Sequence, residues 1–100
     1  MKKDQPLKEG DHGPYGTLSG RPLPDGLAVL FIPSLAALLA RAEELKGSPL
    51  TEEQVIRVRD AAQAVVTRAD AAAATVEQRG YPEVDPLKPW ESWQAIRGGG

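Results

Sequence analysis

The chain contains a run of 28 residues, 52–79, that holds neither glycine nor proline, the two residues that most readily interrupt a helix. Thr51 precedes this run as an N-cap residue, and Gln54 follows three positions later, which is the spacing of a capping box. Gly80 and Pro82 come directly after it and are typical of a helix end. The sequence therefore predicts that helix dominates this half of the chain.

Two interpretations of residues 52–79 compete. A continuous helix would be about 42 Å long and would carry a seam of apolar residues spaced alternately by three and four positions. In the other interpretation Ala64–Thr67 is extended, because its residues are rich in β-branched side chains, and Thr67 with Asp70 begins a second helix. We expect the continuous helix, with the break near Thr67 as the alternative. The seam consists of Val55, Val58, Ala62, Val65, Ala69, Ala72 and Val76.

A second amphipathic helix is predicted between Ser34, a favourable N-cap residue, and Gly47, a favourable helix end. Its apolar residues form one stripe, which consists of Leu35, Leu38, Leu39, Ala42 and Leu45. The apolar run 27–32 precedes it and is compatible with a strand or with the entry to the helix. Pro33 disfavours helical geometry at the residue before it and so favours the strand.

The two ends of the chain are rich in proline or glycine. Residues 1–26 contain five glycines and four prolines, so we expect a flexible N-terminal arm. The C-terminal tail contains Pro82, Pro86 and Pro89, and either Asp85-Pro86 or Lys88-Pro89 could begin a short last helix with proline at its first position. Trp90 and Trp93 would then share one face of that helix, where we expect them to pack against the core.

Together these patterns predict a mainly α fold: a small helical domain of two or three main helices, with room for one short strand pair. The expected organisation is a flexible Gly/Pro-rich arm at 1–26, a single small helical domain at 27–97 with a Pro/Trp-rich C-terminal tail, and a frayed end at 98–100.

Composition excludes several classes of function. The chain has no cysteine, so it can form no disulfide, thiolate metal site or cysteine nucleophile. Its formal net charge of −2 gives no overall attraction to nucleic acid or to an anionic membrane. The longest apolar stretch, 27–40, falls short of the roughly 20 residues that span a bilayer. We expect a cytoplasmic protein that needs no cofactor or metal and has no membrane partner.

Several short motifs resemble a group of small uncharacterised bacterial proteins. They are Phe31–Leu35, Pro49–Glu53, Arg59-Asp60, Arg79–Tyr81, Asp85-Pro86 and Trp90-x-x-Trp93-Gln94. The resemblance covers residues 30–94 and implies a break in the long helix near Thr67–Asp70, where that group carries a proline. It implies no activity.

No pattern of catalytic residues is present. His12 is the only histidine and lies in the expected flexible arm, which cannot hold a general acid or a metal ligand in place. The adjacent carboxylates of Glu43-Glu44 and Glu52-Glu53 would point about 100° apart on a helix and cannot form a catalytic pair. These features weigh against an enzyme.

The candidate site residues are therefore partner-binding ones. Arg57, Arg68 and Arg79 are spaced by eleven residues, so a continuous helix would place them in one basic stripe. The other candidates are Tyr81, Trp90 and Trp93 in the tail. We expect a non-enzymatic protein-interaction module, such as an accessory subunit, an inhibitor or an immunity-type protein, that binds another protein or itself. The alternative is a nucleic-acid-associated regulator that uses the arginine stripe.

Overall fold

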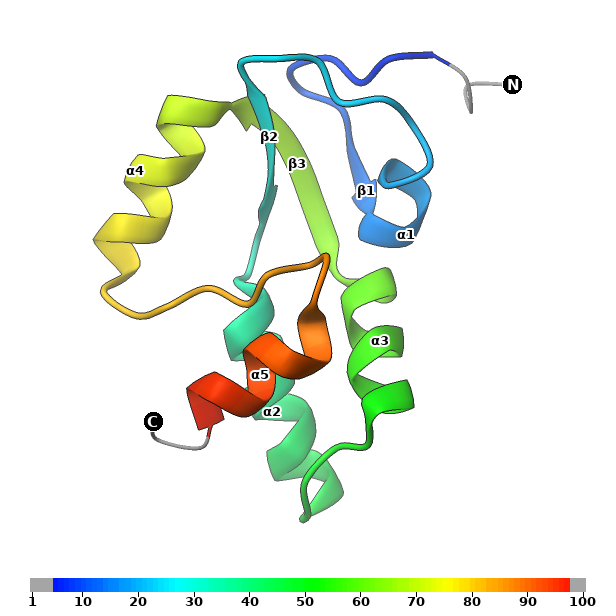
Figure 1. Ribbon diagram of the computed structural model, residues 1–100, viewed down its shortest axis with the longest axis vertical. Coiled ribbons are helices and arrows are strands. Elements are labelled where there is room, and N and C mark those ends of the chain that lie inside the picture. The colour runs from blue at the N-terminus through cyan, green and yellow to red at the C-terminus, as the bar shows by residue number, and fades with distance from the viewer. Residues whose placement is uncertain (1–4, 98–100) are drawn as a thin grey trace.

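The computed structural model describes residues 5–97, so the first four residues of the expected arm and the expected frayed end at 98–100 lie outside the described residues. Within residues 5–97 the chain forms five helices and three strands (Figure 1). In chain order they are β1 (His12–Pro14), α1 (Tyr15–Leu18), β2 (Leu27–Phe31), α2 (Leu35–Lys46), α3 (Glu52–Ala61), β3 (Gln63–Arg68), α4 (Ala69–Arg79) and α5 (Pro89–Arg97). The prediction of a mainly α fold is wrong, because the described chain is a mixed α/β protein.

The three strands form one antiparallel sheet in the order β1-β3-β2. Val65 of β3 lies opposite His12 on one side and Leu30 on the other. Side chains alternate between the two faces of a strand, so Phe31, Ala64 and Val66 share one face, and all three are buried in the main core. Residue 30 lies on the other face, where α4 packs against β2 and β3.

β3 replaces the middle of the predicted long helix. α3 ends at Ala61, the backbone of Ala62 is extended, and the strand then runs through Val65, Val66 and Thr67. The continuous helix and its apolar seam are therefore wrong, and the broken alternative is the closer description. The physical reason is tertiary: β3 is the central strand, so its backbone hydrogen bonds are made to two neighbours instead of along a helix. α4 begins at Ala69 with Arg68 as its N-cap residue, and no side chain caps it.

The N-terminal segment is part of the fold and does not form the flexible arm that we expected. β1 lies in the sheet, and the amide of Gly10 donates to the carbonyl of Val66 over 2.9 Å. Leu7, Tyr15 and Leu18 are all buried in the main core. Gly10, Gly20 and Gly26 lie in turns, whereas Gly13 and Pro14 are part of β1. A segment rich in glycine and proline is therefore ordered here through its buried apolar side chains.

The predicted caps of α2 and α3 are confirmed. Ser34 caps α2 by accepting a hydrogen bond from the amide of Ala37 over 3.1 Å, and Gly47 ends the helix in the left-handed conformation at φ 80°. Thr51 and Gln54 form both hydrogen bonds of the capping box of α3. The two helices are antiparallel neighbours joined by a short loop (Figure 1).

The C-terminal tail crosses in front of the end of β2 and ends in α5, which lies in front of α2 and beside α3 in Figure 1 and contacts α3. Pro89 begins this helix, which is the second of the two starts that the sequence offered. Trp93 is only 5% exposed and Val84 only 1%, and both belong to the main core. Trp90 and Ile96 pack against the same core and are partly buried.

Candidate functional site

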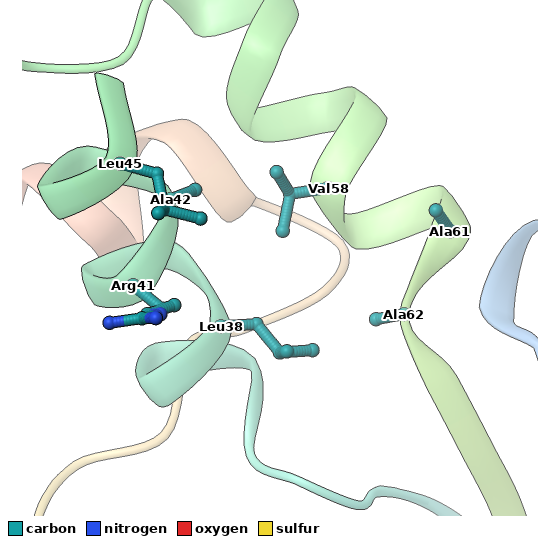
Figure 2. A pocket seen from close by; sticks show the side chains of 7 residues that line it. All are labelled: Leu38, Arg41, Ala42, Leu45, Val58, Ala61 and Ala62. Carbon is teal, nitrogen blue, oxygen red and sulfur yellow. The ribbon is translucent and has the colours of Figure 1, made fainter.

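An open apolar groove lies between α2 and α3 (Figure 2). Its volume is about 290 Å³. The groove is lined by Leu38, Arg41, Ala42, Leu45, Val58, Ala61 and Ala62, and we call this surface the α2/α3 groove. Figure 2 shows α5 behind the two helices, so the groove opens on the side of the molecule away from α5.

The groove forms because each helix has more apolar positions than the core covers. On α2, Leu35 and Leu39 are fully buried and face the core. Leu38, Ala42 and Leu45 lie to one side of that buried line, on the same side of the helix, because residues three and four apart are neighbours on a helix surface. Leu45 is 74% exposed. The predicted apolar stripe of this helix is therefore real, but only part of it is buried within the monomer.

Leu45 lies at the end of the α2/α3 groove that is close to the α2–α3 loop. Ile32 is another large exposed apolar residue, at 55%, but it does not line the groove. Its amide donates to the carbonyl of Gln63 over 3.2 Å, so it continues the pairing of β2 with β3. The exposed apolar residue of the groove itself is therefore Leu45.

Each edge of the groove carries an ion pair: Arg41 is itself a lining residue, and Arg57 lies one helical turn from Ala61 of the lining. On α2, Arg41 lies 3.8 Å from Glu44, and on α3, Arg57 pairs with Glu53. All four side chains are at least two-thirds exposed. Exposed pairs of this kind contribute little to folding, so these charges remain able to interact with a partner.

The predicted arginine stripe does not exist, because Arg57, Arg68 and Arg79 lie on three different elements. Arg57 is on α3, one helical turn from Ala61 of the groove lining. Arg68 is the last residue of β3 and forms an exposed ion pair with Asp70. Arg79 ends α4, where its guanidinium donates to the carbonyl of Phe31 over 2.8 Å. Of the three, only Arg57 borders the groove.

The aromatic candidates hold the tail in place. The hydroxyl groups of Tyr81 and Ser34 share a hydrogen bond of 2.7 Å, which ties the segment after α4 to the start of α2. The indole N–H of Trp93 donates to the carboxylate of Glu43 over 3.2 Å. Trp90 is partly buried against the core. These contacts give the three residues a structural role, on elements other than the two that line the α2/α3 groove.

Glu43 connects three parts of the fold. Its carboxylate also accepts from the amide of Leu50 over 3.1 Å and from the guanidinium of Arg97 over 3.3 Å. Burial by itself would raise the pKa of Glu43, but the hydrogen bonds from Leu50, Trp93 and Arg97 outweigh it and hold that pKa below its ordinary value. Sequence reasoning missed this residue, since nothing local to it indicates partners 7, 50 and 54 positions away.

Within residues 5–97 no group of three or more histidine, aspartate or glutamate side chains is arranged to hold a metal ion. His12 lies in β1 with its side chain exposed. In the same described part of the chain, no helix is both long enough and apolar enough to cross a membrane. Comparison with protein-family models, with curated proteins and with solved structures finds no match to this chain.

Proposed function

We propose that this protein is a cytoplasmic, non-enzymatic interaction module that binds another polypeptide chain through the α2/α3 groove, as an accessory subunit, an inhibitor or an immunity-type protein would. The observation that carries the proposal is that Leu45, at one end of a largely apolar groove, is 74% exposed. Burying a leucine side chain of this kind against a partner contributes about 1.5–3 kcal/mol.

The shape of the surface supports a polypeptide partner. Two antiparallel helices with apolar residues between them offer a groove into which an apolar helix face can dock, a common mode of peptide recognition. A contiguous exposed apolar surface on a small protein commonly marks an interaction site. The lining here is almost wholly apolar, and Arg41 is its only charged residue.

The same surface gives little support to the alternative of nucleic-acid binding. Phosphate recognition depends on several cations on one face, whereas Arg57, Arg68 and Arg79 lie on separate elements. Each is also paired with a carboxylate, from Glu53, Asp70 and Glu83 respectively.

A pair of matched positions tests the proposal. Leu45 is 74% exposed in the groove and Leu87 is 80% exposed in the turn before α5, so both are surface leucines but only one lies at the proposed site. Each is replaced in turn by an apolar photo-crosslinking residue, and the full chain is irradiated in its native host. We expect a protein adduct from position 45 and none from position 87.

The size of the adduct, measured by mass spectrometry, shows whether the partner is another protein or this chain itself. The crosslinking residue at position 45 should no longer form an adduct when Ala61, across the groove, is replaced by a charged residue. If position 45 gives no protein adduct, or if both positions give the same adducts, the groove is not a binding site and the proposed function is wrong.

A further inference from the structure

The charges at the edges of the α2/α3 groove are arranged in a definite order. α2 runs toward the loop at 47–51 and α3 runs away from it, so the two helices are antiparallel. Glu44 is about 4.5 Å closer to that loop along α2 than Arg41, at 1.5 Å per residue. Glu53 is about 6 Å closer to the loop along α3 than Arg57. Both edges therefore carry their anion toward the loop and their cation away from it.

We infer that the groove is occupied by a second copy of this chain, docked face to face with its helices antiparallel to those of the first copy. The inference rests on the proposed function and names the partner. A two-fold axis that lies in the interface and perpendicular to the helices places α2 over the α2 of the partner subunit and reverses its direction. Arg41 then meets the partner's Glu44, and Arg57 meets the partner's Glu53, each contact occurring twice.

The other face-to-face arrangement is disfavoured by the same charges. A two-fold axis parallel to the helices would bring together residues at the same distance from the loop. Cations would then face cations at Arg41 and Arg57, and anions would face anions at Glu44 and Glu53. Like charges brought together across an interface oppose association, so the pattern selects the antiparallel arrangement.

The exposed Leu45 obeys the same symmetry. An axis that places Arg41 opposite the partner's Glu44 and Arg57 opposite the partner's Glu53 crosses the helices about 6–7 Å from the loop, at 1.5 Å per residue. Leu45 lies about 3 Å from the loop on the same scale, so this axis places it between the partner's Leu38 and Ala42, which both line the groove. The most exposed apolar residue of each groove is thereby covered by the groove of the other copy.

The balance of charge also favours a second copy over a strongly charged partner. The two edges hold two cations and two anions, already paired within each edge. A highly acidic partner would meet the glutamates and a highly basic one the arginines. A copy of this chain brings two cations and two anions in the complementary order.

Charge reversal tests this inference in solution. One variant, Arg41→Glu with Arg57→Glu, carries only anions on both edges, and another, Glu44→Arg with Glu53→Arg, carries only cations. The association of the full chain is measured by sedimentation equilibrium up to about 1 mM, since a pair that binds more weakly than this would hardly form at all. We expect the wild type to dimerise and each variant alone to lose at least about a hundredfold in affinity. An equal mixture of the two variants should form dimers again.

Arg68→Glu is the matched control, because Arg68 is exposed and paired but lies away from the groove, so this variant should dimerise like the wild type. Circular dichroism checks that the variants fold, which the exposure of all four edge residues leads us to expect. A wild type that stays monomeric, variants that dimerise alone, or a mixture that stays monomeric would overturn the inference. If the chain is monomeric while position 45 crosslinks to a different protein, the inference fails and the proposed function stands. If no adduct forms either, both fail.

Discussion

Leu18 provides the most direct test of whether the N-terminal segment belongs to the fold. It is the last residue of α1, is 2% exposed, and packs in the main core. Replacing it with alanine removes most of a buried side chain and leaves a cavity that the surrounding residues fill only in part. Leu23 lies in the same segment but is 46% exposed, which makes Leu23→Ala the matched control.

The expected magnitude follows from burial. A buried leucine replaced by alanine costs about 2–5 kcal/mol, according to how far the site can collapse. A domain of this size loses roughly 4–8 °C of thermal midpoint for each kcal/mol. Leu18→Ala should therefore lower the midpoint by at least about 8 °C. The side chain of Leu23 is already about half exposed, so Leu23→Ala should change the thermal midpoint by no more than about 3 °C.

Thermal unfolding followed by circular dichroism measures both variants under the same conditions. A flexible N-terminal arm, as the sequence suggested, would make the two substitutions equally harmless. If Leu18→Ala unfolds within about 3 °C of the wild type, the packing of α1 is wrong and the glycine- and proline-rich segment does not contribute to the core.

Two further predictions concern the tail and its attachment. Trp93→Ala should lower the free energy of unfolding by about 3–5 kcal/mol in chemical denaturation, because the side chain is only 5% exposed. Trp90→Ala should lower it by less, because Trp90 is only partly buried, and the reverse order would contradict this packing. Folding lowers the pKa of Glu43, so the ionised carboxylate stabilises the fold fully at neutral pH and this stabilisation is lost as the pH falls through the acidic range. Glu43→Gln should therefore make the free energy of unfolding fall less steeply with acid pH. An unchanged pH profile would contradict this role.

Local signals predicted the ends of the helices well. Ser34, Gly47, the capping box at Thr51 and the start of α5 at Pro89 all act through contacts within a few residues along the chain. Gly80 likewise ends α4 in the left-handed conformation. These features depend on backbone hydrogen bonds that need local partners only, so a single sequence contains the information that sets them.

Strand pairing was not predictable in the same way. Residues 63–68 follow a helical spacing of apolar residues well enough to continue α3, yet they form the central strand of the sheet. What decides between the two is the presence of β1 and β2, whose residues pair with residues of β3 between 33 and 53 positions later in the chain. β1 has only three residues, one of them Gly13 and another Pro14, and no periodic pattern indicates it. The misjudged arm and the misjudged long helix are therefore one error, since each strand needs the other.

The prediction of the arginine-stripe site failed for the same reason. The arginine stripe required a continuous helix from 52 to 79, and it disappears once β3 interrupts that helix. The α2/α3 groove, in contrast, uses apolar residues that the sequence did identify, such as Leu38, Leu45 and Val58. A periodic pattern shows that a helix has an apolar face but not how much of that face the rest of the chain covers. α5 packs over one side of the two helices and leaves Leu45 exposed on the other, and this division of one apolar surface between core and groove is set only by the tertiary fold.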